Sequence, residues 1–63
     1  MEQLTAPYGQ IIELRQIMHE SGMRLLRVII RDGGHYTTLD LDPATAHAWG
    51  KTLLTWVETY DHA

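Results

Sequence analysis

Residues 23–31 have the sequence MRLLRVIIR and decide the fold, because apolar side chains recur on both faces of the strand that they predict. Side chains of a strand alternate between its faces, so positions two apart share a face. One face, which we call the first face, carries three aliphatic residues: Leu26, Val28 and Ile30. The second face carries two more, with a cation between them: Leu25, Arg27 and Ile29. A chain of 63 residues can cover only one of these faces with a helix, so we expect the second face to meet another chain.

A tight turn follows this strand at residues 32–34, Asp-Gly-Gly. Either residues 32–33 or residues 33–34 can form the two-residue turn of a β-hairpin. The first choice pairs Leu26 with Leu39, and the second pairs Leu26 with Leu41. Both choices place Leu39 and Leu41 on the first face, and both predict a strand over about residues 35–41.

The loop before the strand, residues 20–22 (Glu-Ser-Gly), suits a three-residue connection that ends on a left-handed glycine. This loop sets Leu14 opposite Val28 and so adds a third strand to the first face. A two-residue loop would set Arg15 opposite Val28 instead, which buries a charge and makes that register the worse one.

A helix is predicted over residues 43–60, because Asp42 is a good N-cap and Pro43 suits the first helical position. Apolar and small residues then recur at spacings of three and four, and we call them the apolar stripe: Ala46, Trp49, Gly50, Leu53, Val57 and Tyr60. We interpret Gly50 as a point where the helix backbone closely approaches the sheet. Eighteen helical residues span roughly 27 Å, close to the roughly 30 Å of a nine-residue strand.

These elements predict an α+β fold, β-β-β-α, in which a three-stranded antiparallel β-meander is followed by one C-terminal helix packed on the first face. The meander occupies residues 10–41 and the helix residues 43–60. Residues 1–9 form a loose lead-in or a short edge strand, and the whole chain, residues 1–63, is a single domain.

Composition narrows the classes of function. The chain has no cysteine and so cannot form disulfides. Its formal net charge of −3 disfavours nucleic acid and anionic membranes as partners. Its N-terminal residues lack a basic segment followed by an apolar one, so we expect a cytoplasmic protein that does not span a membrane.

No residue pattern indicates catalysis, a metal site or a cofactor. Ser21 lies in a predicted turn, while His19 and His35 lie at opposite ends of the sheet, about 23 Å apart by strand geometry. We assign Asp40 to the end of a strand and Asp42 to the cap of the helix, rather than to acid–base chemistry. We therefore expect a protein that is not an enzyme.

The second face is the predicted interface, since interfaces favour apolar surface mixed with arginine. Its predicted centre comprises Ile17, Leu25, Arg27, Ile29 and Tyr36. Arg15 lies opposite Arg27 and requires a carboxylate nearby, from Glu13, from Asp40 or from a partner. Trp49 and Trp56 project along one edge of the helix, where they either enlarge the core or form a ridge that a partner covers.

The sequence thus predicts a small interaction or accessory protein, acting as a homodimer or as a subunit docked on a larger, unidentified protein. The alternative is a module that binds single-stranded nucleic acid on the exposed sheet, through Arg15, Arg27, Arg31, His35 and Tyr36. In its order of elements, residues 10–60 resemble the single-strand-binding transcriptional coactivator family, which implies a sheet platform and a dimer. The negative charge and the single lysine favour the interaction protein.

Overall fold

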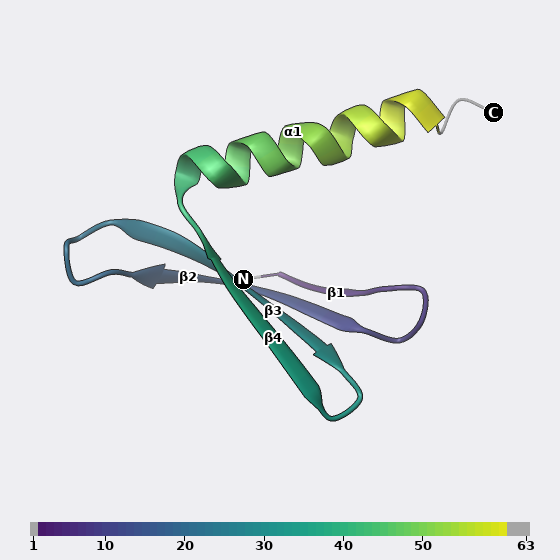
Figure 1. Cartoon of the computed structure of the whole chain (residues 1–63), viewed down its shortest axis with the longest axis horizontal. Coiled ribbons are helices and arrows are strands. Elements are labelled where there is room, and N and C mark those ends of the chain that lie inside the picture. Colours follow the sequence, from purple (N-terminus) through teal and green to yellow (C-terminus); the bar gives the residue numbers. More distant parts are fainter. Residues whose placement is uncertain (1, 61–63) are drawn as a thin grey trace.

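The computed structural model describes residues 2–60 and shows an antiparallel sheet followed by one helix (Figure 1). The elements are β1 (Gln3–Thr5), β2 (Ile11–Met18), β3 (Arg24–Asp32), β4 (His35–Leu41) and α1 (Pro43–Tyr60). The four strands lie in the order β1-β2-β3-β4. This arrangement confirms the predicted α+β class, the meander and the bounds of the helix, and it corrects the predicted strand count from three to four.

The additional strand is β1, which pairs antiparallel with β2 at the edge of the sheet. The Ala6 N–H donates to the Gln10 carbonyl over 2.7 Å, and the Gly9 N–H donates to the Ala6 carbonyl over 3.0 Å. Gly9 has a φ of 87°, which lets the chain reverse between the two strands. Of the two expectations for residues 1–9, the short edge strand is therefore confirmed at Gln3–Thr5, while Met1 lies outside the described residues.

The register of β2 against β3 is the one that keeps charges off the first face. Leu14 pairs with Val28, as predicted, and Arg15 pairs with Arg27 on the second face. The loop between the strands closes when the Gly22 N–H donates to the His19 carbonyl over 2.8 Å. Gly22 has a φ of 89°, so the left-handed glycine predicted for this loop is confirmed.

The hairpin between β3 and β4 adopts the second of its two predicted registers. Leu26 pairs with Leu41, and Val28 pairs with Leu39. Gly33 has a φ of 63°, as the first central residue of a type II′ turn requires. Leu39 and Leu41 consequently lie on the first face.

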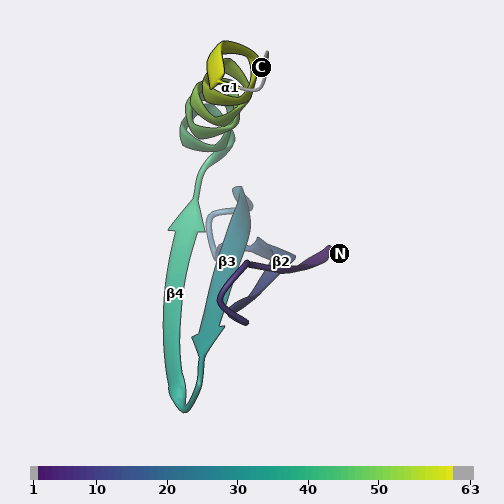
Figure 2. The same ribbon diagram turned by 90° about the vertical axis from the view of Figure 1, so that its right-hand side faces the viewer.

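The core of the described chain is very small. Only Val28 and Leu41, 2% and 5% exposed, are buried apolar residues among residues 2–60. The contacts of α1 with the sheet are made to β3 and β4, and Figure 2 shows the helix beyond the end of β4 rather than flat along the strands. The cover that α1 gives to the first face of its own sheet is therefore much smaller than the sequence predicts.

The shape of the chain agrees with this limited packing. The radius of gyration is 13.7 Å, whereas a compact chain of 63 residues has one of about 10.6 Å. The principal extents are 46 × 30 × 16 Å. Within residues 2–60, α1 is not long and apolar enough to cross a membrane.

Candidate interaction surfaces

The helix begins immediately after β4, because the residue between them is an N-cap. The Thr45 N–H donates to Asp42 Oδ1 over 2.9 Å, and the Ala46 N–H donates to the Asp42 carbonyl over 2.9 Å. The hydrogen bonds with Thr45 hold the pKa of the Asp42 carboxyl below its ordinary value. Pro43 fixes the first helical φ and restricts the conformation of the residue before it. Asp42 is thus a one-residue connection whose conformation is set on both sides.

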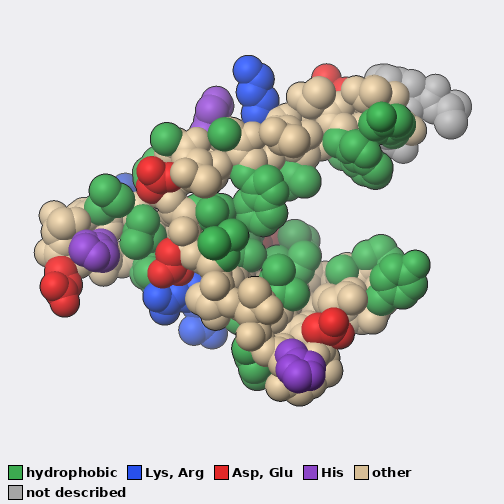
Figure 3. All heavy atoms as spheres, in the orientation of Figure 1, with side chains coloured by type: hydrophobic (Ala, Val, Ile, Leu, Met, Phe, Trp, Pro, Cys, Tyr) green, Lys and Arg blue, Asp and Glu red, His purple; other side chains and the backbone are tan. Residues whose placement is uncertain are grey.

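The apolar stripe of α1 lies open to solvent. Among the side chains of the described helix, none is buried. Trp49 is 42% exposed, Leu53 52% and Val57 43%, although they occupy the centre of the stripe. Figure 3 shows apolar side chains along the side of the helix that faces the sheet, with the outer half of the helix standing clear of it. Residues 2–60 therefore leave the stripe uncovered over most of its length.

The two tryptophans do not enlarge the core of the chain. Trp49 keeps 42% of its surface exposed and Trp56 keeps 61%. The Trp56 ring instead lies against the Tyr60 ring of the same helix, with centroids 5.6 Å apart and planes tilted by 40°. Trp49 and Trp56 thus belong to the exposed surface of α1, together with Leu54 at its opposite margin, which is 63% exposed.

Gly50 lies within the stripe, but the space beside its Cα atom is open. A Cβ atom placed on Gly50 would meet no atom within 4 Å. The predicted close approach of the helix backbone to the sheet is therefore wrong for the single chain. The prediction fails because α1 meets the sheet near its first turns and then diverges from it (Figure 1).

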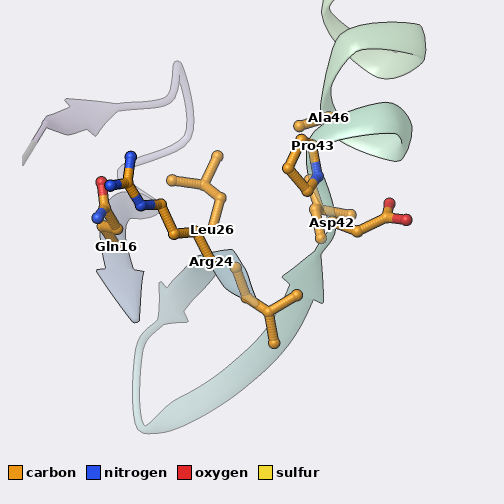
Figure 4. Close-up of a pocket in the computed structure, with 8 residues that line it drawn as sticks. Gln16, Arg24, Leu26, Asp42, Pro43 and Ala46 are labelled. Atoms are coloured by element: carbon orange, nitrogen blue, oxygen red, sulfur yellow. The ribbon is translucent and has the colours of Figure 1, made fainter. Parts of the chain in front are cut away.

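The first face of the sheet is only partly covered. Leu39 is 51% exposed, and four further aliphatic residues of this face are half-buried: Ile12, Leu14, Leu26 and Ile30. A small apolar hollow of about 140 Å³ lies between the first residues of β3 and the start of α1. Figure 4 shows Leu26 on one side of this hollow and Pro43 and Ala46 on the other. The open surface thus continues from the sheet onto the base of the helix.

Two arginines of the second face, Arg15 and Arg27, have carboxylate partners within the chain. Arg27 forms a bidentate pair with Asp40, with Nε to Oδ1 at 2.9 Å and Nη2 to Oδ2 at 3.1 Å. Hydrogen bonding to Arg27 lowers the pKa of the Asp40 carboxyl, and the same bond raises the pKa of Arg27. Arg15 forms an ion pair with Glu13. The repulsion expected between Arg15 and Arg27 is therefore relieved without a partner chain.

The structure places the predicted centre of the second face on one side of the sheet, with Ile17 opposite Leu25 toward one end and Tyr36 opposite Arg31 toward the other. Ile17, Leu25 and Ile29 are half-buried between neighbouring strands, whereas Tyr36 is 66% exposed. The Arg31 guanidinium carbon lies 6.0 Å from the centroid of the Tyr36 ring. Apart from Tyr36, this predicted centre is less exposed than the apolar stripe. The sequence predicts that Leu53, Val57 and Tyr60 are buried against the sheet. An apolar stripe indicates burial, but it does not identify the chain that covers it.

Ser21 and His19 lie in the loop between β2 and β3, and His35 begins β4, as expected from the sequence. His19 Nδ1 lies 3.0 Å from Ser21 Oγ, and this hydroxyl also accepts from the Met23 N–H over 3.4 Å. These contacts shape the loop between β2 and β3. In the described residues, no three histidine or acidic side chains are placed together to hold a metal ion.

The fold and its surfaces define a small α+β protein, a four-stranded meander with a helix that stands largely free of it. The chain belongs to DUF6967, a family of unknown function whose pattern matches residues 1–59. Comparisons with curated proteins and with solved structures gave no match.

Proposed function

We propose that this protein is a non-enzymatic interaction protein that works as a homodimer or as a subunit docked on a larger protein. The observation that carries the proposal is the exposure of the apolar stripe of α1, a helix without a buried side chain in the described residues. Contiguous apolar surface of this kind marks association sites in soluble proteins.

Energetics support the proposal. Leaving a leucine or valine side chain in water forfeits about 1.5–3 kcal/mol relative to its full burial. Leu53 and Val57 each keep about half of their surface exposed, while among residues 2–60 the buried apolar side chains are those of Val28 and Leu41. A chain of this size has a stability of a few kcal/mol even when its core is complete. Association therefore supplies burial that the folded state lacks in one copy.

The nucleic-acid alternative receives little support from the second face. The guanidinium groups of Arg15 and Arg27 are engaged by Glu13 and Asp40. Phosphate binding would have to compete with these carboxylates, which reduces the release of counterions that drives such binding.

The proposal is tested by the mass of the protein in solution and in its native cell. Light scattering of the purified chain and affinity capture of a tagged chain, with the mass of the captured complex, should show association. We expect a particle of at least twice the 7.2 kDa chain mass. A monomer that stays monomeric at high concentration and captures nothing would contradict the proposal.

A further inference from the structure

We propose that two copies of the chain exchange helices, so that α1 of each copy packs on the first face of the other copy's sheet. This inference rests on the proposed function and names its partner as a second copy. It also names the surfaces that meet: the apolar stripe of one chain and the first face of the other.

The connection between β4 and α1 favours exchange over closure within one chain. Only Asp42 lies between the last strand residue and the first helical residue. Laying α1 down on its own sheet requires a reorientation at this residue, which would disturb the hydrogen bond between Asp42 and Thr45. Pro43 restricts the same residue further. Short connections of this kind favour the exchange of an element between copies.

The surface area of the chain matches what a dimer buries. A compact folded chain of 7.2 kDa exposes about 4,100 Å². This chain exposes 5402 Å², an excess of about 1,300 Å² over the compact value. A specific interface of standard size buries about 800 Å² from each partner. The excess of one chain is therefore sufficient for its half of a stable interface.

The two open surfaces also match each other. The eighteen residues of α1 span about 27 Å, and the nine residues of β3 span about 30 Å. The apolar stripe contains no charged residue, so the exchanged helix itself brings no charge into this contact. Lys51 and Glu58 lie on the other side of the helix, where an exchanged helix would keep them in water.

A second copy satisfies both surfaces with one symmetric contact. Each chain has one uncovered stripe and one partly covered first face. In a two-fold dimer the same pair of surfaces meets twice, so the stripe and the face of both chains are covered together. A different protein would have to supply both a helix that covers the first face of this chain and a groove that holds α1.

Cysteine cross-linking tests the exchange directly, since the natural chain has no cysteine. Leu39→Cys places a thiol on the first face, and Val57→Cys places one on the apolar stripe. The two single variants are mixed, refolded together and treated with a short bifunctional maleimide. We expect a cross-linked product of about 14 kDa, twice the chain mass. Replacing Val57→Cys by Thr55→Cys, on the opposite side of α1, should reduce this product at least tenfold.

The double variant Leu39→Cys with Val57→Cys separates exchange from closure. At low protein concentration, exchange gives linked dimers, whereas a helix folded on its own sheet gives an internally linked chain of monomer mass. Predominance of the monomer product would overturn the exchange.

A substitution pair tests the same contact without cross-links. Leu53→Asp should dissociate the dimer, whereas Thr55→Asp, a matched change on the polar side of α1, should leave it intact. Amide spectra of β2–β4 check that both variants retain the sheet. A dimer that survives Leu53→Asp but dissociates on Ile29→Asp would overturn the exchange and leave the proposed function standing. A wild-type monomer that binds no protein would overturn both.

Discussion

Arg27 and Asp40 face each other across β3 and β4 and join their side chains by two hydrogen bonds, of 2.9 and 3.1 Å. This pair lies in the middle of the second face, where the sequence also places Arg15 opposite Arg27. Its carboxylate neutralises a charge that would otherwise require one from another chain. Arg27 therefore needs no carboxylate from another chain, and the exposed apolar stripe of α1 is the feature on which the proposed association rests.

The ion pair makes folding stability depend on acid pH. The pKa of Asp40 is lowered in the folded chain below the ordinary value of 3.8 by its hydrogen bond with Arg27. Its stabilising contribution is thus present above pH 3.8 and is lost as the pH falls through the lowered pKa. Chemical denaturation between pH 2 and pH 6 should show this fall, and Asp40→Asn should diminish it. Asp42 contributes in the same direction, so an equally steep fall in Asp40→Asn would assign the effect to the helix cap.

Gly50→Ala should stabilise the helix. Alanine is favoured over glycine in a helix by about 0.8–1 kcal/mol, and the added Cβ would meet no atom of the same chain within 4 Å. Thermal and chemical denaturation, with Ala48→Gly as the reverse substitution on the polar side, measure the change. A loss of stability in Gly50→Ala would show that the second copy's sheet approaches this position too closely for a Cβ atom.

Tyr36→Ser should leave the exchanged dimer intact but weaken docking on a larger protein. Tyr36 is the most exposed member of the predicted second-face interface, and exposed tyrosines are frequent anchors in such contacts. The measurement is the amount of partner protein recovered by affinity capture with Tyr36→Ser, with the natural chain and with Thr38→Ser. Thr38→Ser is a control at a neighbouring position on the same face. Equal recovery of the captured protein from Tyr36→Ser would remove this residue from the interface.

The chain should bind single-stranded DNA or RNA only weakly at about 150 mM salt, in the range of non-specific binding or weaker. The physical reason is the pairing of Arg15 and Arg27 with carboxylates of the same face. Fluorescence anisotropy of a labelled oligonucleotide, repeated at two salt concentrations, measures the affinity. A sub-micromolar dissociation constant would instead assign Arg31 and Tyr36 to a nucleic-acid site.

The register of the sheet could be predicted from the sequence because shifting it would bury charges. Placing Arg15 instead of Leu14 opposite Val28 would bury a charged side chain, and this free-energy cost excludes the shifted register. The structure has the favoured pairing of Leu14 with Val28. The choice between the two turns at residues 32–34 carried no such penalty. Both turns put leucines on the first face, so the sequence left both open.

The short strand β1 and the position of α1 were less predictable, for different reasons. Three residues, Gln3–Thr5, are too few to show an apolar period, and their pairing with β2 depends on the turn before Gln10. The apolar stripe shows that one side of α1 favours burial, but periodicity does not specify which chain provides the cover. The same limit applies to Trp49 and Trp56, for which the sequence left both a core and a surface role open.

The smallness of the core has a consequence for how much folded protein a cell contains. Val28 and Leu41 alone are too little burial for an independent domain. When the remaining burial comes from a second copy, folding and assembly become one equilibrium, and the folded fraction rises with the total amount of chain. At chain concentrations below the dissociation constant of the dimer, most chains would be unfolded and accessible to proteases. The expression level would therefore act as a threshold for the appearance of the folded dimer.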